Sequence, residues 1–232
     1  MKITLVTASQ KSKIEDTWLG QSIAQFDPKF ALFHKVIFYG DNKQPLSLLY
    51  NQAIDSSRND NADIIIFVHD DVYINCSDFI RRVIKYTQMY TVFGLAGTEK
   101  ATIKEPALWH LMGGRENLRG CVAHGLYTTE YGYTSFGHLP ARALLIDGVF
   151  IGVNLKTLPE SIRFDENIPS KFHYYDLCFS LDCSLNKVVV GVGDIPIVHK
   201  SPGLSGVSAE WIAGQQYFLS KYKKYENKVL TV

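Results

Sequence analysis

The sequence predicts a single α/β domain whose central sheet is mostly parallel and flanked by helices. Strand-like and helix-like segments alternate over the first 100 residues, which is the pattern of a parallel sheet covered by helices. The length of 232 residues fits one α/β domain. The hydrophobic content of 46% is typical of a folded globular chain, so wholesale disorder is excluded.

Four strands and three helices are expected in this first part. Short apolar runs rich in β-branched residues predict strands at 3–7, 36–39, 64–68 and 92–96. Ser12, with Glu15 three residues later, resembles a capping box that opens the first helix. The second helix is expected over 46–58, and Ser77 is expected to cap the third. The strand 64–68 is apolar on both faces, as a central parallel strand should be.

The second part of the chain is less regular. Residues 98–140 are rich in Gly, Tyr and His and show no sustained period, so we expect a long functional or mobile region without clear elements. A strand over 143–153 is expected to be interrupted at Asp147-Gly148. The remaining expected elements are a helix over 172–186, strands at 188–192 and 195–198, and a helix over 211–225.

Charge and cysteine content narrow the function classes. Twenty-four Lys and Arg face 23 Asp and Glu, which argues against a general polyanion-binding surface and against a nucleic-acid partner. The four cysteines show neither a CxxC pair nor zinc-ligand spacing, so we expect reduced thiols in a cytoplasmic protein. The apolar runs are far shorter than the roughly 20 residues of a membrane span, and the N-terminus does not resemble a signal peptide. We therefore expect a soluble protein.

Two adjacent carboxylates follow the strongest predicted strand. Asp70 and Asp71 come after His69, at the carboxyl end where open α/β sheets place their ligands. Adjacent carboxylates repel each other unless a cation or hydrogen-bond donors lie between them, and Mg²⁺ and Mn²⁺ prefer carboxylate oxygens. An imidazole beside them shifts the preference toward Mn²⁺. The cluster predicts a divalent-metal site; the alternative is a carboxylate that merely caps the following turn.

Four motifs follow one another along the chain. They are Tyr50-Asn51-Gln52-Ala53-Ile54 before His69-Asp70-Asp71-Val72, then Ile146-Asp147-Gly148-Val149-Phe150, then Phe164-Asp165-Glu166 with Phe172-His173-Tyr174-Tyr175-Asp176-Leu177, and Val198-His199-Lys200-Ser201. In this order they resemble the motifs of the GT-A glycosyltransferases, in particular the glycosyltransferase-2-like group related to the StrF-type proteins of streptomycin biosynthesis. The resemblance implies a GT-A fold with a small antiparallel extension over 1–203. Within it, a nucleotide-binding half is expected at about 1–100 and an acceptor half at about 101–203, followed by a C-terminal helix and tail at 204–232.

The resemblance also implies a metal site. His69-Asp70-Asp71 takes the place of the family's Asp-x-Asp motif, with His69 at the first acidic position. Asp71, together with His199 and His69, is then expected to hold Mn²⁺ or Mg²⁺ against the diphosphate of a nucleotide-sugar. Asp70 is expected to face the ribose. Taken alone, His199 after a strand is as readily a structural histidine.

A general base is implied at the start of the predicted helix 172–186. Asp176 matches the Asp of the Glu-Asp motif of inverting enzymes, which deprotonates the acceptor hydroxyl. Tyr175 stands in place of the Glu, and His173 is the alternative base. The competing interpretation of Asp176 is a cap for the helix that follows.

Nucleotide recognition is expected at the ends of the first two strands. The candidates, each of which could equally serve an ordinary turn or cap, are Thr7, Ala8, Ser9, Asp41, Asn42 and Asn51. The sugar is expected near Asp147-Gly148, where a residue without a Cβ lets a ligand approach the backbone. The aromatic residues of 109–133 suit stacking on a sugar and selection of the acceptor, or pack only on one another.

These expectations predict a metal-dependent, inverting glycosyltransferase of the hexosyl or deoxyhexosyl class that acts in polysaccharide biosynthesis. It would move a sugar from a UDP-, GDP- or dTDP-sugar to a glycan or lipid-linked glycan. The stretch Trp211–Lys228 combines aromatic residues with lysines and suits peripheral membrane contact, although packing of the aromatic side on the domain is the simpler interpretation. Two alternatives stay open: a non-catalytic nucleotide- or sugar-binding module of the same fold, and a sugar nucleotidyltransferase, whose glycine-rich phosphate loop is missing from Thr7–Lys13. The chain has no Gly-x-Gly-x-x-Gly, which disfavours a dinucleotide-binding dehydrogenase.

Overall fold

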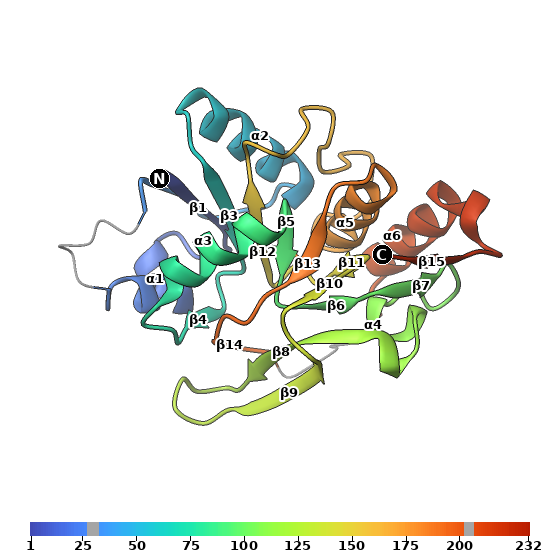
Figure 1. Ribbon diagram of the computed structural model, residues 1–232. Coiled ribbons are helices and arrows are strands. Elements are labelled where there is room, and N and C mark those ends of the chain that lie inside the picture. Colours follow the sequence, from blue (N-terminus) through green and yellow to red (C-terminus); the bar gives the residue numbers. More distant parts are fainter. Residues whose placement is uncertain (27–32, 202–206) are drawn as a thin grey trace.

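The computed structural model describes residues 1–26, 33–201 and 207–232 and contains two mixed sheets with helices packed on them (Figure 1). The strands of the larger sheet are Ile3–Ala8 (β1), Lys35–Tyr39 (β2), Ile64–Val68 (β3), Val92–Gly94 (β5), Ala141–Arg142 (β10), Phe150–Asn154 (β12) and Val190–Val192 (β13). Their order across the sheet is β10-β13-β5-β12-β3-β1-β2.

Five of these seven strands run in one direction. β1 pairs in parallel with both β2 and β3, and β13 pairs in parallel with β5. β12 lies antiparallel between β3 and β5, and β10 lies antiparallel to β13. The mostly parallel α/β sheet that the sequence predicts is therefore confirmed, with β3 buried along its whole length.

The second sheet is the extension, and its pairs are antiparallel except for one parallel pair. Its strands are Val72–Ile74 (β4), Ala96–Thr98 (β6), Leu118–His124 (β8), Gly132–Gly137 (β9), Leu145–Ile146 (β11) and Ile197–His199 (β14). They are ordered β11-β6-β8-β14-β4, with β9 on the other side of β8. Two further strands, Lys100–Thr102 (β7) and Val229–Thr231 (β15), pair with each other.

The extension occupies much of residues 98–140, so the expectation of a region without clear elements is wrong. These strands contain glycines, which interrupt the alternation of apolar and polar residues by which a strand is predicted. Gly120 in β8 has a φ of +117°, and a Cβ on it would lie 2.2 Å from the Leu95 carbonyl oxygen. Glycine is needed there because the neighbouring backbone comes too close for any side chain.

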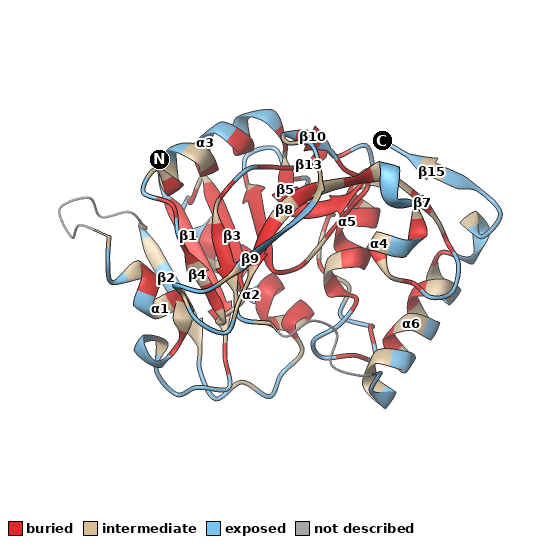
Figure 2. Ribbon diagram, turned by 90° about the horizontal axis from the view of Figure 1, so that it is seen from below, coloured by how far each residue is buried: buried red, intermediate tan, exposed pale blue. Residues whose placement is uncertain are grey.

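The helices cover both faces of the larger sheet. They are Ile14–Asp16 (η1), Trp18–Ile23 (α1), Leu46–Asn59 (α2), Phe79–Met89 (α3), Trp109–Met112 (α4), Arg115–Asn117 (η2), Tyr175–Leu185 (α5), Ala209–Lys221 (α6) and Lys223–Tyr225 (η3). Tyr50 of α2 packs on Phe67 of β3, whereas Phe79 of α3 packs on Phe150 of β12. Phe67 and Phe150 are offset by one position in the β3–β12 register, so α2 and α3 lie on opposite faces. Figure 2 shows the strands buried between exposed outer helix surfaces.

Two expected helix caps are wrong. The Ser12 hydroxyl donates to Asp41 Oδ1 at 2.9 Å, and α1 begins instead after Thr17, whose Oγ1 accepts from the Gly20 amide at 2.9 Å. The third helix begins after Asp78 rather than Ser77. The residue that precedes each helix therefore lies one or five positions after the serine that the local pattern indicated.

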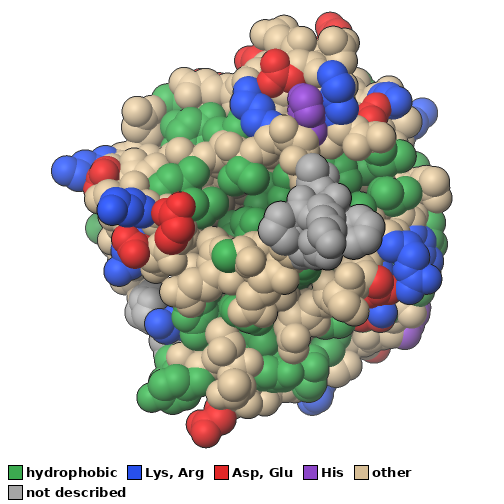
Figure 3. Space-filling model, turned by 90° about the vertical axis from the view of Figure 1, so that its left-hand side faces the viewer, with side chains coloured by type: hydrophobic (Ala, Val, Ile, Leu, Met, Phe, Trp, Pro, Cys, Tyr) green, Lys and Arg blue, Asp and Glu red, His purple; other side chains and the backbone are tan. Residues whose placement is uncertain are grey.

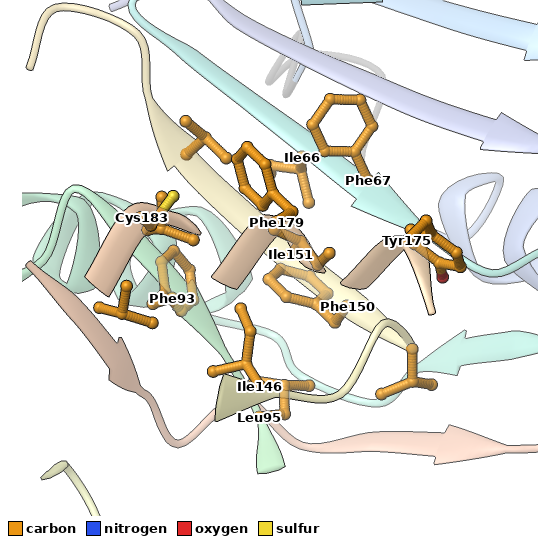
Figure 4. Close-up of a cluster of buried hydrophobic side chains, with 14 of the residues drawn as sticks. Ile66, Phe67, Phe93, Leu95, Ile146, Phe150, Ile151, Tyr175, Phe179 and Cys183 are labelled. Carbon is orange, nitrogen blue, oxygen red and sulfur yellow. The ribbon is translucent and has the colours of Figure 1, made fainter. Parts of the chain in front are cut away.

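The core between the larger sheet and α5 is rich in aromatic rings. Phe179 of α5 stacks on Phe164 with 4.1 Å between ring centroids, and Phe164 packs edge-on against Phe67 of β3. Figure 4 shows this cluster, with Tyr175 at its edge beside the end of β3. The first turn of α5 is thereby fixed next to the carboxyl end of β3, where the acidic motif begins.

The aromatic side of α6 faces the domain. Phe218 is fully buried, and the Tyr217 hydroxyl donates to Asp165 at 2.8 Å. Lys221 Nζ lies 2.7 Å from a carboxylate oxygen of both Asp165 and Asp182. These contacts agree with the simpler interpretation of 211–228, in which the helix packs on the body of the protein.

The surface carries both charge signs. On the face shown in Figure 3, acidic and basic side chains lie interspersed among uncharged ones. Among the described helices none has the length and hydropathy needed to cross a membrane. The boundary expected between residues 203 and 204 lies outside the described residues.

Candidate active site

Two cavities meet at the carboxyl end of β3. The smaller, of about 360 Å³, lies against the ends of β1 and β2 and the start of α2. The larger, of about 460 Å³, lies between α4, β8, the turn before β12 and the first turn of α5. His69 and Phe172 line both cavities. The arrangement suits two ligands that come together at His69.

Three of the predicted metal ligands are brought together at this junction. His69 and Asp71 lie in the link between β3 and β4, and β14 pairs with β4 so that His199 is opposite Val72. Asp71 Oδ1 is 3.3 Å from His199 Nε2 and 4.0 Å from His69 Nδ1. Strand pairing therefore places a residue 128 positions away beside the acidic motif.

These residues fit a divalent cation. One ligand atom from each lies within 4.8 Å of the others. Asp71 Oδ1 is shielded from solvent and makes no well-oriented hydrogen bond among the described residues, although His199 Nε2 lies 3.3 Å away, and a cation would satisfy such an oxygen. Burial raises the pKa of Asp71, but the contact with His199 and the nearby His69 outweigh it, so the pKa is lowered and the group is a carboxylate. Two imidazoles and one carboxylate suit Mn²⁺ better than Mg²⁺.

The second nitrogen of His69 is held by a residue to which sequence reasoning gave no role. His69 Nε2 lies 2.8 Å from the Tyr175 hydroxyl, and that hydroxyl donates to the Gly148 carbonyl oxygen at 3.1 Å. Burial raises the pKa of Tyr175 well above its ordinary value, so the group is a neutral phenol. No local pattern could indicate this contact, because the two side chains are 106 positions apart.

The candidate base faces the larger cavity. Asp176 lies in the first turn of α5, and its Oδ2 accepts a hydrogen bond of 2.8 Å from the Gly148 amide. Burial, reinforced by the charge of Asp147, raises the pKa of Asp176 to about 7. His173, the alternative base, is exposed and lines the same cavity. A carboxyl group with this pKa can exchange a proton near neutral pH.

Asp147 and Gly148 also line the larger cavity, in roles partly different from those expected. Asp147 accepts from Trp109 Nε1 at 3.0 Å and from the Val149 amide at 2.9 Å. A Cβ on Gly148 would lie 2.3 Å from the Tyr175 hydroxyl oxygen. The glycine therefore makes room for Tyr175, where we expected it to admit a ligand.

The smaller cavity receives four of the seven residues predicted to contact the base or ribose. Ala8, Ser9, Asn42 and Asp70 line it, together with Tyr50, which was not predicted. The Ser9 hydroxyl donates to Asp70 Oδ2, and the backbone N–H of Asn42 donates to the Ser9 carbonyl oxygen at 2.8 Å. The turns after β1 and β2 are thus tied to each other and to the acidic motif.

Three predicted nucleotide ligands line neither cavity. Thr7 is fully buried in β1. Asp41 has a φ of +51° in a turn and accepts from Ser12. Asn51 is buried, and its amide group exchanges two hydrogen bonds of 2.9 Å with the Phe164 backbone. Each of these side chains is buried or makes contacts within the protein. A sequence motif cannot distinguish such a residue from one that binds a nucleotide.

The aromatic residues of 109–133 divide into two groups. Trp109 lines the larger cavity and packs edge-on against Phe136, with centroids 5.0 Å apart. Tyr131 and Tyr133 contact each other at the far end of the β8–β9 hairpin, outside the cavity. His124, which was not predicted, lines the cavity because β8 pairs it with His199 in register.

Comparison with known proteins identifies the family. The model of the family described as "Glycosyltransferase like family" matches residues 36–232. A search of curated proteins gave no match. Among solved structures, A197 from STIV is similar at 11% identity, over 90% of this chain and 98% of that chain, with a TM-score of 0.47. A glycosyltransferase involved in the glycosylation of the major capsid of PBCV-1 is similar at 10% identity, over 95% of this chain and all of that chain, with a TM-score of 0.41. The family match spans most of the sequence and agrees with the GT-A type of α/β fold, so the chain belongs to the glycosyltransferase-like family.

Proposed function

We propose that this protein is a metal-dependent, inverting glycosyltransferase that moves a sugar from a UDP-, GDP- or dTDP-sugar to a hydroxyl of a glycan or lipid-linked glycan. Family membership supports glycosyl transfer in general. The observation that carries the finer proposal is the junction of two cavities at His69, with the His69–Asp71–His199 cluster on it and Asp176 in the larger cavity. Donor and acceptor would meet at that junction.

The smaller cavity is proposed to bind the nucleoside. Asp70 is held by Ser9, so one of its oxygens is fixed and the carboxylate is oriented to accept from a ribose hydroxyl. Ala8 and Asn42 complete the wall at the ends of β1 and β2. The diphosphate would then lie toward His69, which also borders the larger cavity.

His69, Asp71 and His199 are proposed to hold the cation. A divalent ion bound there would supply electrostatic stabilisation of the negative charge that develops on the leaving diphosphate. The three residues come from separate strand ends and keep their relative positions through the β4–β14 pairing. The chain therefore presents this site without a large rearrangement.

Asp176 is proposed to take the proton from the acceptor hydroxyl. Its Oδ2 is oriented by the Gly148 amide, and its pKa of about 7 matches a base that works near neutral pH. Attack by that hydroxyl from the side opposite the diphosphate inverts the anomeric carbon. The larger cavity, lined by Trp109 and Phe136, would hold the sugar and the acceptor against apolar ring faces. His173 is the second candidate for the base.

The finer assignments complete the proposal. We place the chain in the StrF-type group, as a hexosyl or deoxyhexosyl transferase of polysaccharide biosynthesis. Residues 1–100 would form the nucleotide half, 101–203 the acceptor half, and 204–232 a C-terminal helix and tail. Four free cysteines support a cytoplasmic location, because thiols stay reduced there. Peripheral membrane contact through Trp211–Lys228 would involve the exposed lysines beyond α6.

The test is donor turnover. Purified protein is incubated with a panel of UDP-, GDP- and dTDP-sugars and Mn²⁺, and released nucleoside diphosphate is measured with and without a chelator. We expect release from at least one donor, loss of it on chelation, and loss of it in Asp176→Asn. Asp55→Asn, which changes an exposed carboxylate of α2, is the matched control and should keep full activity. Release that survives both chelation and Asp176→Asn contradicts the mechanism, and binding of UDP without release from any donor favours the non-catalytic module.

A further inference from the structure

A buried tyrosine hydroxyl connects the first turn of α5 to the proposed metal ligands. The Tyr175 side chain is almost fully shielded from solvent, and its ring packs against Tyr50 and Phe164 with centroids 5.6 Å and 6.2 Å away. Its oxygen lies 2.8 Å from His69 Nε2 and 3.1 Å from the Gly148 carbonyl oxygen. The packed ring fixes the hydroxyl between these two partners, at the edge of the cluster in Figure 4.

The number of protons on Tyr175 and His69 determines which group donates in each of these two hydrogen bonds. A phenol has one proton to donate, and a neutral imidazole has one N–H. The Gly148 carbonyl can only accept, so the proton of Tyr175 points to it. The contact with His69 then requires an N–H at Nε2. The opposite assignment would leave the buried Gly148 carbonyl without a donor in this contact, which is unfavourable.

We infer that Tyr175 is a positioning residue that holds His69 in the Nε2–H tautomer, so that its Nδ1 lone pair faces Asp71 and His199 as a metal ligand. The inference rests on the metal site of the proposed function. Nδ1 is the His69 nitrogen that lies 4.0 Å from Asp71 Oδ1. An imidazole whose second nitrogen is hydrogen-bonded in this way keeps both its ring orientation and its tautomer.

Gly148 supports the same arrangement from the opposite side. Its carbonyl accepts the proton of Tyr175, and a Cβ at this position would lie 2.3 Å from the Tyr175 oxygen. Any larger residue would therefore displace the hydroxyl from His69. The role of Tyr175 thus depends on a glycine 27 positions before it.

The tautomer can be measured directly in the wild-type protein. A long-range ¹H–¹⁵N correlation spectrum of metal-free, ¹⁵N-labelled protein at mildly alkaline pH reports which nitrogen of each imidazole carries the proton. The chain has seven histidines, and comparison with His69→Gln identifies the signals of His69. We expect protonated Nε2 and unprotonated Nδ1. A His69 with its proton on Nδ1 overturns the inference, and this measurement needs neither turnover nor a folded Tyr175 variant.

The consequence for the metal is tested with Tyr175→Phe, which removes only the hydroxyl. Binding of Mn²⁺ alone is followed by electron paramagnetic resonance of the free ion. We expect the dissociation constant to rise on the order of tenfold to 100-fold, as for other groups that orient a ligating histidine. Tyr217→Phe removes a hydroxyl bonded to Asp165, away from both cavities, and should leave Mn²⁺ affinity unchanged.

Three outcomes separate this inference from the proposed function. Equal Mn²⁺ affinity in the wild type and Tyr175→Phe overturns the inference, even if the enzyme turns over a nucleotide-sugar. Weaker affinity in Tyr175→Phe, with the expected tautomer, supports it even if no donor in the panel is consumed. A wild-type protein that binds no Mn²⁺ overturns both the metal site and the positioning role of Tyr175.

Discussion

Replacing Asp176 by Asn is expected to abolish turnover and to stabilise the fold at neutral and higher pH. The carboxyl group is surrounded by protein, close to Asp147, and its pKa is raised from 3.8 to about 7. Asn has nearly the same shape, and its carbonyl oxygen can still accept from the Gly148 amide. The variant therefore removes the charge while keeping the packing. The loss of turnover and the gain in stability then both come from the loss of this ionisable group.

The size of the stability effect follows from the pKa. A carboxyl group whose pKa is higher in the folded than in the unfolded chain keeps its proton longer when folded, so the folded state loses stability as pH rises from about 4 to about 7. About three pKa units correspond to about 4 kcal/mol, which the wild type loses over this interval and the Asn variant does not. The variant should match the wild type near pH 4 and exceed it above pH 7.

Urea unfolding at pH 4, 6 and 8 measures this difference for Asp176→Asn against the wild type. The activity arm uses kcat/KM of the wild type, which should fall about tenfold per pH unit below pH 7, because the base must be deprotonated. Asp55→Asn is the control for the activity arm, since its carboxylate is exposed and lines neither cavity. Parallel stability curves for the wild type and Asp176→Asn would refute the reasoning, because the ionised group would then carry no burial cost.

Three further changes test other parts of the site and fold. Asp71→Asn should lower metal-dependent turnover on the order of 100-fold, measured as diphosphate release at saturating Mn²⁺, because the cluster loses its charge; unchanged release would remove Asp71 from the site. Asp147→Asn should lower the pKa of Asp176, so the acid limb of the kcat/KM profile should move to lower pH, and an unmoved limb would contradict the like-charge effect. Lys221→Met removes the cation that bridges Asp165 and Asp182, to which only Tyr217 and Tyr222 among these helix side chains then still donate, so the free energy of unfolding should fall by about 1–3 kcal/mol with kcat unchanged; an unchanged urea midpoint would contradict this.

The larger sheet could be predicted because its strands carry their own signals. β3 is a continuous run of buried branched and aromatic side chains, and α2 has a regular apolar face that ends at a turn. The acidic motif follows β3 directly, so its place at the sheet edge could be read from its position in the sequence. These features are local to each element. They suffice to predict an element whose buried side chains recur at regular intervals.

The extension and several contacts could not be predicted, because they depend on partners far along the chain. β6 and β11 are two or three residues long and are stabilised by their neighbours rather than by a pattern of their own. The sequence around Asn51 does not reveal whether its side-chain amide binds a nucleotide or the Phe164 backbone, which lies 113 positions away. Which of the two occurs is decided by tertiary packing.

The role of Tyr175 shows the same limit inside the site. If the proposed function holds, His69 stands at an acidic position of the Asp-x-Asp motif, and Tyr175 stands at the Glu position of the Glu-Asp motif. The structure places these two side chains 2.8 Å apart. Two carboxylates at that distance would repel each other, so one would need a proton or a cation.

In the inferred arrangement the His69–Tyr175 pair is uncharged, because His69 donates to the Tyr175 oxygen and Tyr175 donates to the Gly148 carbonyl. A carboxylate at either position would place a charge in this buried contact, which has a desolvation cost even where a phenol or an imidazole donates to it. The neutral pair avoids that charge, so the two residues act together. In the proposed mechanism, the pair would free Nδ1 of His69 for a cation, Asp71 would supply the negative charge of the cluster, and Asp176 would act as a base in the larger cavity.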